Sequence, residues 1–223
     1  MGKSSAFLGT VTVIAVALLA LYGIVSWPES AIQPDSVQNM PPTVTTVPGS
    51  DFGNPSLGEA DAPLTVFVYG DYQCIACAQI EPDLIEVVTG YPNQLRLVWK
   101  DLPNERIHPD ARNAAVAARC ANDQGGFWKF HDLLMSNQSS LDEYNFSTFA
   151  AQSGLDAERF SSCYTVRQTE PLVDRDVEEA LALGVDATPY LFVGRIRLTG
   201  AVSADRLRAT IDSELARLAA EGR

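Results

Sequence analysis

The pattern of apolar and polar residues along the chain alternates between strand-like and helical stretches. Residues 64–69 form an apolar, strand-like run, and residues 94–99 alternate as a second strand. Between them, residues 78–88 carry apolar side chains at helical spacing, and Pro82 within this stretch is expected to kink the helix. A strand, a helix and a strand in this order predict a right-handed parallel crossover.

The pattern then becomes helical and returns to strands only near the C-terminus. Residues 108–183 contain no strand-like run, and the helices expected there cover 111–120, 127–135, 146–152, 157–166 and 171–183. Residues 190–193 and 196–199 are predicted as the two short strands of a hairpin. Ser203 is expected to cap a closing helix with one apolar stripe. The order of elements predicts an α/β core that is interrupted by a helical insert.

The N-terminus begins with an apolar run without charge, residues 6–27. At about 1.5 Å per residue this run is long enough to cross a hydrocarbon core of about 30 Å. Lys3 precedes it and Glu29 follows it, so the positive-inside rule places the N-terminus in the cytoplasm and the rest of the chain outside. A cleaved signal peptide is the alternative, because an Ala-Val-Ala tripeptide lies within the run. Cleavage there would leave residues 18–27 as an apolar terminus, which favours an uncleaved anchor.

Two cysteines, Cys74 and Cys77, lie where the first strand meets its helix. This spacing can close a small reversible disulfide, and the first thiol lies where free backbone N–H groups and the helix dipole favour an anion. Such a position commonly lowers the pKa of a cysteine from about 8.5 to roughly 3.5–7.5. We therefore expect Cys74 to be the exposed nucleophile and Cys77 the buried resolving thiol. Paired cysteines also bind zinc, but the remaining cysteines and histidines form no second close pair, and no metal is expected.

The net charge narrows the range of partners. The chain has 28 Asp and Glu against 16 Lys and Arg, a formal net charge of −12. This excess argues against binding to nucleic acid and against a close electrostatic approach to anionic lipid. The four cysteines would permit two disulfides in an oxidising compartment.

From about residue 56 to the C-terminus, the chain resembles DsbA-type thiol-disulfide oxidoreductases of the thioredoxin superfamily. The features that carry the resemblance are the Cys74–Cys77 motif, Pro82 at the kink position, the helical insert, and Thr188-Pro189 directly before a strand. The sequence of residues 117–134 also resembles the insert of membrane-anchored members. The resemblance implies an α/β thioredoxin fold with an inserted α-helical domain, preceded by one N-terminal transmembrane helix.

These expectations divide the chain into four parts. We expect a transmembrane signal-anchor at residues 1–27 and a proline-rich linker at residues 28–55. A thioredoxin-like domain is expected at residues 56–106 and 184–223, with the helical insertion at residues 107–183.

The resemblance also implies roles for Thr188 and Pro189. In the family a cis-proline faces the paired cysteines, and Pro189 is the matching position. An X-Pro bond is the peptide bond that becomes cis at modest cost, and the bend would leave the backbone of Thr188 free to pair with an extended substrate beside Cys74. The alternative is that Pro189 only begins an edge strand. We expect Cys74 and Cys77 to be catalytic and Thr188 and Pro189 to bind substrate.

Other residues are expected to serve the structure. Cys120 and Cys163 fall in predicted helices of the insert, where a structural disulfide would contribute about 2–4 kcal/mol; a second redox relay is the alternative. The residues expected to pack in the core or insert are Trp99, Phe127, Trp128 and Phe130, and those expected at the surface or at helix caps are His108 and His131.

The chain departs from its relatives around the paired cysteines. The best-known family members have histidine directly before the second cysteine, where this chain has Ala76 after Ile75. Some relatives bury an acid six residues before the first cysteine, where this chain has Val68. Asp71 is the nearest carboxylate in the sequence, and a turn-forming role is expected for it. These differences do not change the expected class of reaction, but they are expected to affect the redox potential of the pair.

The sequence thus predicts a protein of the cell membrane, with a single transmembrane segment and its catalytic domain on the extracytoplasmic side. Its expected activity is to form disulfides in exported proteins through Cys74 and Cys77, without a cofactor. The implied partners are exported proteins with cysteine thiols and a membrane quinone-linked reoxidase. A reductase or isomerase that uses the same pair is one alternative. A non-enzymatic, membrane-tethered module that binds peptides is the other.

Overall fold

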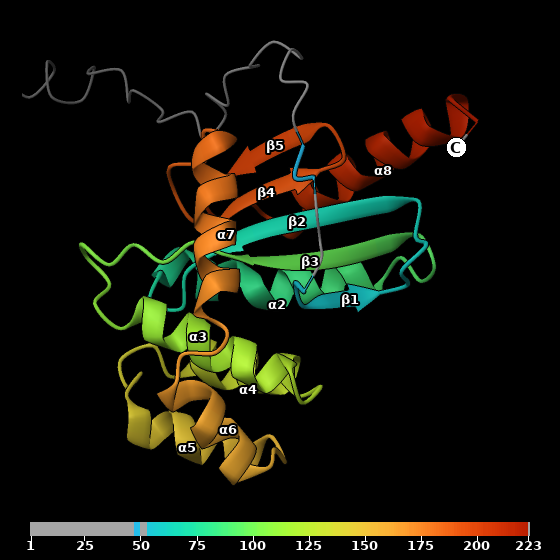
Figure 1. Cartoon of the computed structure of the whole chain (residues 1–223). Coiled ribbons are helices and arrows are strands. Elements are labelled where there is room, and N and C mark those ends of the chain that lie inside the picture. The colour runs from blue at the N-terminus through green and yellow to red at the C-terminus, as the bar shows by residue number, and fades with distance from the viewer. Residues whose placement is uncertain (1–46, 50–52, 223) are drawn as a thin grey trace, which may run out of the picture. The chain divides into compact units, whose positions relative to one another are not determined.

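A computed structural model describes residues 47–49 and 53–222 of the chain (Figure 1). The predicted signal-anchor at residues 1–27 and most of the predicted linker lie outside the described residues. Among the residues that are described, no helix has the length and apolar character needed to cross a membrane.

A five-stranded sheet forms the core of the described part, with strand order β1-β3-β2-β4-β5. The strands are β1 (Ser56–Gly58), β2 (Leu64–Gly70), β3 (Leu95–Asp101), β4 (Tyr190–Val193) and β5 (Ile196–Thr199). β2 runs parallel to β3, and the other three pairs are antiparallel. β2 therefore lies between β3, which precedes the insert in the sequence, and β4, which follows it. β1 was not predicted, because a Ser-Leu-Gly tripeptide is too short to show a strand period.

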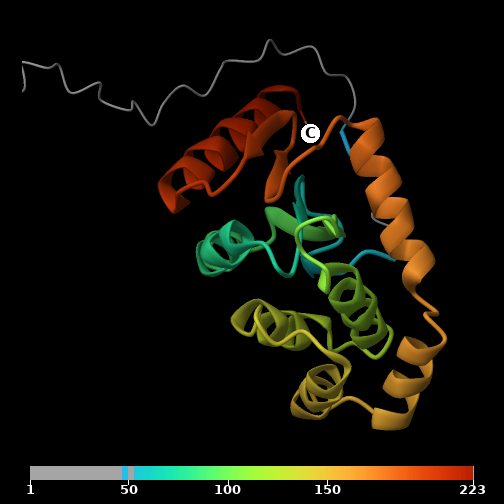
Figure 2. The same ribbon diagram turned by 90° about the vertical axis from the view of Figure 1, so that its left-hand side faces the viewer.

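Helices cover the two faces of the sheet. α2 (Ile75–Thr89) joins β2 to β3 as the predicted crossover helix and contains Pro82, and it contacts α8 (Ala204–Ala220). The Ser203 side chain accepts a hydrogen bond from the Arg206 N–H, so the predicted cap of α8 is confirmed. Figure 2 shows α2 and α8 on one side of the sheet and α7 (Glu170–Ala182) on the other.

The helical insert is present as predicted, and its helices lie within a few residues of their expected bounds. They are α3 (Ala111–Asn122), α4 (Phe127–Ser136), α5 (Glu143–Gln152), α6 (Ala157–Thr165) and α7. α5 begins three residues earlier than expected, because the Asp142 carboxylate caps it by accepting the Asn145 N–H. α3 contacts α4, α5, α6 and α7, whereas α7 also packs against β3. The aromatic side chains expected in the interior are buried or partly buried there.

A buried network of charges fixes the insert to the sheet. Arg119 of α3 donates to Asp101 of β3 at 2.5 Å and also to Asp176 of α7. Lys100 lies 3.4 Å from Asp176, and the Asn54 amide donates to the same carboxylate at 2.8 Å. The side chains of Arg119 and Asp176 are fully buried, so each charge depends on its partners to offset the loss of water.

This network gives a prediction with a matched control on the same helix. Asp176→Asn leaves Arg119 and Lys100 buried without their shared carboxylate, and we expect the free energy of unfolding to fall by about 3–5 kcal/mol. Asp174→Asn removes a charge two residues away, where the side chain is 51% exposed and pairs with Arg112, and should cost less than about 1 kcal/mol. Urea unfolding of the two variants measures the difference. Equal losses would show that the buried network does not hold α7 to the sheet.

Candidate active site

The redox loop, residues 70–74, connects the end of β2 to the start of α2 and is organised by Asp71. The Asp71 carboxylate accepts the backbone N–H groups of Gln73 and Asn104, each at 2.7 Å, and lies 2.8 Å from Nδ1 of His108. Its backbone carbonyl accepts the N–H of Cys74. The bond to Gln73 is the turn-forming role expected for this aspartate. The other two contacts tie the loop to the segment that leads into α3.

Cys74 is the N-cap residue of α2. Its Sγ lies 3.4 Å from the Thr188 carbonyl oxygen. The pKa of Cys74 is lowered from 9.0 to about 5, first by the hydrogen bond from the Cys77 thiol. Burial opposes this shift. Hydrogen bonds from the Thr188 side chain and from the backbone N–H groups of Ala76 and Cys77 add to it. At neutral pH the first cysteine is therefore a thiolate.

The exposure predicted for Cys74 is wrong, because only 7% of the residue is accessible. Thr188 lies against its sulfur, and the Gln138 side chain donates to the carbonyl of Cys74 at 2.9 Å and to that of Tyr72 at 3.0 Å. In contrast, the next residue, Ile75, is 71% exposed. The first cysteine is thus largely covered, and the next residue presents an exposed apolar side chain.

Cys77 lies one turn further along α2 and is 2% exposed. The pKa of Cys77 is raised well above its usual range, first by the hydrogen bond to Cys74, then by burial and by the Cys74 charge. Both cysteines are free thiols in this structure. The pair therefore consists of one stabilised thiolate and one buried thiol that keeps its proton.

Thr188 and Pro189 are brought to the paired cysteines by the sheet. The peptide bond between them is cis, and it directly precedes β4, which pairs with β2 through Tyr69 and Tyr190. Because β2 leads into the redox loop, this pairing sets the Thr188 carbonyl against the Cys74 sulfur. The four residues predicted to form the site thus come from two segments that meet at one end of the sheet.

The prediction of a surface or capping position is wrong for His131, which is fully buried on α4. Its Nδ1 lies 3.0 Å from the Tyr72 hydroxyl, and its Nε2 lies 2.9 Å from Oε1 of Glu81. The ring also packs among the side chains of Trp99, Phe127 and Trp128. Burial is tolerated because both ring nitrogens have hydrogen-bond partners. The other histidine, His108, is partly buried and contacts Asp71.

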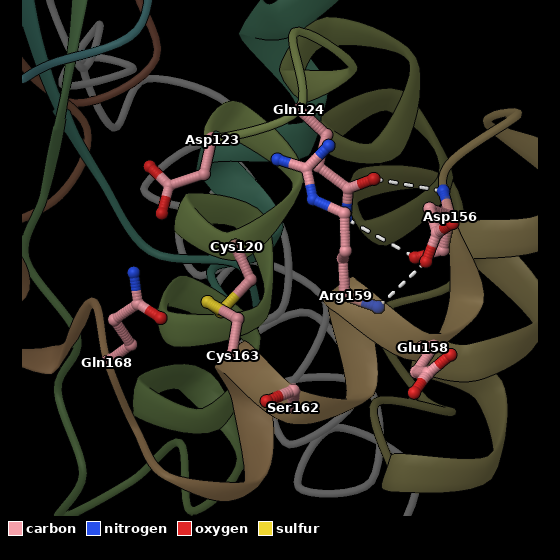
Figure 3. Close-up of a pocket in the computed structure, with 9 residues that line it drawn as sticks. All are labelled: Cys120, Asp123, Gln124, Asp156, Glu158, Arg159, Ser162, Cys163 and Gln168. Carbon is pink, nitrogen blue, oxygen red and sulfur yellow. Dashed lines mark hydrogen bonds between the residues drawn. A yellow bond between two sulfur atoms is a disulfide. The ribbon is translucent and has the colours of Figure 1, made fainter.

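Cys120 and Cys163 form a disulfide that joins α3 to α6, with 5.8 Å between their Cα atoms. Figure 3 shows this bond beside a pocket of about 450 Å³. The other residues that line the pocket are Asp123, Gln124, Asp156, Glu158, Arg159, Ser162 and Gln168. All of them belong to the insert, and none belongs to the redox loop or α2. The pocket is therefore separate from the thiol pair.

No group of three or more His, Cys, Asp or Glu side chains among residues 47–49 and 53–222 is arranged to hold a metal ion. A thiolate beside a buried thiol can instead exchange disulfides, because the thiolate is the species that attacks a sulfur–sulfur bond. The geometry of this site therefore suits the chemistry of a thiol-disulfide oxidoreductase.

Comparison with families of known proteins matches residues 51–213 to the family described as thioredoxin. The chain belongs to the thioredoxin family, because this match covers well over half of its length. The predicted resemblance to DsbA-type proteins and the predicted thioredoxin fold with a helical insert are confirmed by this match and by similar solved structures.

Several solved structures resemble the described part of this chain. A thioredoxin-like oxidoreductase from Silicibacter pomeroyi DSS-3 is 26% identical, with a TM-score of 0.66 over 73% of this chain and 92% of that one. BdbD from Bacillus subtilis is 23% identical, with a TM-score of 0.67 over 75% and 95% of the two chains. The thiol-disulfide exchange protein α-DsbA2 from Wolbachia pipientis is 20% identical, with a TM-score of 0.67 over 73% and 88%. The last two similarities show a shared fold.

Curated relatives include two Na⁺/H⁺ antiporters. NhaA 1 of Salinispora arenicola is 38% identical over 159 residues, which are 71% of this chain and 24% of that protein. NhaA 3 of Salinispora tropica is 36% identical over 167 residues, which are 74% of this chain and 26% of that protein. The chain spans about a quarter of the length of these relatives, so their transport activity is a property of those proteins.

The lowered pKa of Cys74 predicts an unusual pH dependence of its reactivity. Alkylation of the reduced chain by iodoacetamide should keep a constant rate down to about pH 6, because the thiolate alone reacts. The rate should then fall as the pH passes through the pKa of about 5. Cys74→Ser should lack this fast reaction, since Cys77 is 2% exposed and its burial raises its pKa. A rate that still rises between neutral and alkaline pH would contradict the assignment.

The insert disulfide gives a second prediction. Replacing both Cys120 and Cys163 with alanine should lower the free energy of unfolding by about 2–4 kcal/mol, because the unfolded chain loses a cross-link. Urea unfolding measures the loss. The pH dependence of Cys74 alkylation should stay as in the parent. The disulfide and the pocket beside it are formed by residues of the insert and include no residue of the redox loop or α2. A changed reactivity of Cys74 would favour the alternative of a second redox relay.

Proposed function

We propose that this chain is an extracytoplasmic thiol-disulfide oxidoreductase that forms disulfides in exported proteins, with Cys74 and Cys77 as its catalytic pair. The observation that carries the proposal is the difference between the two thiols. Cys74 is a thiolate because its pKa is about 5, whereas the pKa of Cys77 is raised and its thiol is buried.

In the proposed reaction, a client thiolate attacks Sγ of Cys74 in the oxidised pair. The bond between Cys74 and Cys77 breaks, and Cys77 leaves with the electron pair and takes up a proton. A second client thiolate then attacks the client sulfur of the mixed disulfide and releases Cys74 as a thiolate. The client gains a disulfide, and the chain gains the two electrons that the client loses.

The stabilised thiolate supports the oxidase direction. Stabilising Cys74 as a thiolate stabilises the reduced chain, and this makes the disulfide a stronger oxidant. A reductase or isomerase would use the same pair at a lower potential. A non-enzymatic module that binds peptides would have no need of an activated thiol, so the low pKa of Cys74 also speaks against that alternative.

Thr188 and Pro189 are proposed to receive the client. Thr188 lies against the sulfur that the client must reach, and the segment directly precedes an antiparallel strand. An extended client segment that pairs with the Thr188 backbone would carry its own cysteine toward Cys74. The exposed side chain of Ile75, the residue after Cys74, offers the client an apolar contact.

The proposal also includes the location of the protein in the cell and the partner that reoxidises its cysteine pair. The apolar run at residues 6–27 would hold the chain in the cell membrane with the thioredoxin-like part on the extracytoplasmic side. The resemblance to DsbA-type proteins supports a membrane quinone-linked oxidase as the partner that restores the Cys74–Cys77 disulfide. The proposed clients are exported proteins that carry pairs of thiols.

Trapping of mixed disulfides tests the catalytic pair. Cys77→Ser is first given a disulfide between Cys74 and glutathione. A thiolate of a reduced, unfolded client protein then displaces glutathione as its thiolate, and we expect the mixed disulfide to accumulate because the variant lacks the thiol that would expel the client from Cys74. Cys74→Ser should accumulate none, and the parent chain in its oxidised form should transfer its disulfide to the client. Non-reducing electrophoresis and mass mapping measure the adducts. Equal trapping by both variants would refute the assignment of Cys74 as the attacked sulfur.

A further inference from the structure

We propose that Gln138, which lies in the turn between α4 and α5, is a positioning residue for the exchange. Its side-chain amide holds the main chain of the redox loop, so that Cys74 is kept as a stable thiolate and leaves a client readily. The inference rests on the proposed function and deepens it. It gives the helical insert a part in the chemistry of Cys74 and Cys77, which both lie outside the insert.

The amide of Gln138 contacts two carbonyl groups of the redox loop. Its Nε2 donates to the carbonyl oxygen of Cys74 at 2.9 Å and to that of Tyr72 at 3.0 Å. A side-chain amide nitrogen carries two N–H groups, so each carbonyl can receive one of them. The two bonds therefore fix the loop on both sides of Gln73, directly before α2 begins.

The turn that carries Gln138 is itself held in place. The side chain of Asn137 donates to the Leu133 carbonyl at 2.7 Å, which fastens the start of the turn to the last residues of α4. The N–H of Ser140 donates to the Asn137 carbonyl at 2.9 Å, and the side chain of Leu141 is buried. The amide of Gln138 is thus presented to the redox loop from a fixed position.

Other contacts also hold the redox loop, but they are made to its neighbouring residues. The Gln73 side chain accepts the Asp110 N–H at 2.7 Å and donates to the Asp110 carboxylate at 3.3 Å. The Tyr72 hydroxyl lies 3.0 Å from Nδ1 of His131. The contact of Gln138 differs from these because one of its two bonds is made to Cys74 itself.

The stability of the Cys74 thiolate depends on where its main chain lies. The pKa of Cys74 is about 5, first because the Cys77 thiol donates to its sulfur, with smaller support from Thr188 and the first N–H groups of α2. A hydrogen bond weakens steeply as its angle and distance change, so these donors act only while Cys74 keeps its position. The carbonyl of Cys74 accepts the N–H groups of Cys77 and Ala78 and also the amide of Gln138. Gln138 therefore fixes the peptide group next to the carbon from which the sulfur projects.

The amide of Gln138 also acts through its own partial charges. Carbonyl oxygens carry partial negative charge, and two of them belong to the short loop that holds the thiolate. The N–H groups of Gln138 offset this charge without adding a titratable group. Loss of the two bonds should therefore raise the pKa of Cys74.

The carboxylates around the redox loop already have partners of their own. Asp71 accepts two backbone N–H groups and lies 2.8 Å from His108. Asp110, at the start of α3, contacts Gln73. Replacing Gln138 leaves both of these contacts in place, so a change in the reactivity of the loop would come from the lost amide bonds.

A higher pKa of Cys74 changes two properties of its sulfur in opposite directions. In the second step of the proposed reaction, a client thiolate attacks the client sulfur of the mixed disulfide. The bond to Cys74 breaks, and Cys74 leaves as a thiolate with the electron pair. A thiolate of lower pKa leaves faster but attacks more slowly. Without the bonds from Gln138, Cys74 should therefore be a poorer leaving group and a better nucleophile.

Gln138→Met tests this role, because methionine has about the length of glutamine and no N–H group. Alkylation of the full, reduced chain by iodoacetamide should have its pH midpoint about one unit higher than in the parent. The constant rate above the midpoint should rise about threefold, as a more basic thiolate attacks faster. In glutathione buffers at pH 7 the equilibrium should shift by about tenfold toward the oxidised chain, which corresponds to a potential about 30 mV less oxidising. Transfer of the disulfide from the oxidised variant to a reduced, unfolded client should be slower than in the parent.

Matched variants distinguish the amide bonds from packing. Gln124 makes the same kind of contact within the insert, since its side chain donates to the Asp156 carbonyl and accepts the Asp156 N–H. Gln124→Met should leave the midpoint and the potential as in the parent. Gln138→Lys keeps N–H donors and adds a positive charge, so its midpoint should lie at or below that of the parent. Gln138→Glu replaces the donors with a negative charge and should raise the midpoint at least as far as Gln138→Met. It carries the test if Gln138→Met does not fold.

The possible results separate the role of Gln138 from the proposed function. A parental midpoint in Gln138→Met or Gln138→Glu, or a raised midpoint that Gln138→Lys or Gln124→Met shares, would overturn the positioning role and leave the exchange intact. A parent chain without a fast thiolate or without disulfide transfer would instead overturn the proposed function. A midpoint that rises in Gln138→Met and Gln138→Glu alone, together with a less oxidising potential, would support the positioning role.

Discussion

The antiparallel pairing of β2 with β4 is the constraint on which the site depends. β2 delivers Cys74 to the start of α2, and β4 delivers Thr188, which lies 114 residues away in the sequence, to the same end of the sheet. A chain that places six helices and β3 between two neighbouring strands must bring its ends back together against the entropy of a long loop. The sheet accomplishes this because β4 and β2 bury apolar side chains on both faces.

The insert must in turn be fixed, since a mobile insert would not hold α4 and the Gln138 side chain over the redox loop. The network of Arg119, Asp101 and Asp176 provides this connection from three elements at once. The attraction within a buried ion pair does little more than offset the cost of removing both charges from water, and it does so only when the partners are well positioned. Their effect here is to select one position of α3 and α7 on the sheet. Gly70 contributes by its size, because a Cβ there would overlap the Trp99 ring that supports His131.

Sequence patterns predicted the elements whose period is strong and the residues that a motif marks. The strand before the paired cysteines, the closing hairpin and the insert helices follow from apolar spacing. The burial of Glu81 and His131 was not predicted, because charged and polar side chains on a helix are usually solvated. A signal was nevertheless present: Glu81 shares a helix face with Cys77, and His131 shares one with Phe127. Arg119 gave no such signal, since its partners are far away in the chain.

The pairing of Cys74 with Cys77 explains how Cys74 can be a thiolate without a charged residue in its motif. Ile75 and Ala76 offer no cation, and the sequence left only the helix terminus and backbone N–H groups as supports. The structure adds a stronger one, because the hydrogen bond from the Cys77 thiol is the largest cause of the low pKa of Cys74. This donor exists only while the disulfide is open and Cys77 holds its proton. It therefore stabilises the reduced chain selectively, and each 1.4 kcal/mol of such stabilisation makes the couple about 30 mV more oxidising. Protonation of Cys77 therefore completes the opening of the disulfide and also raises the redox potential of the pair.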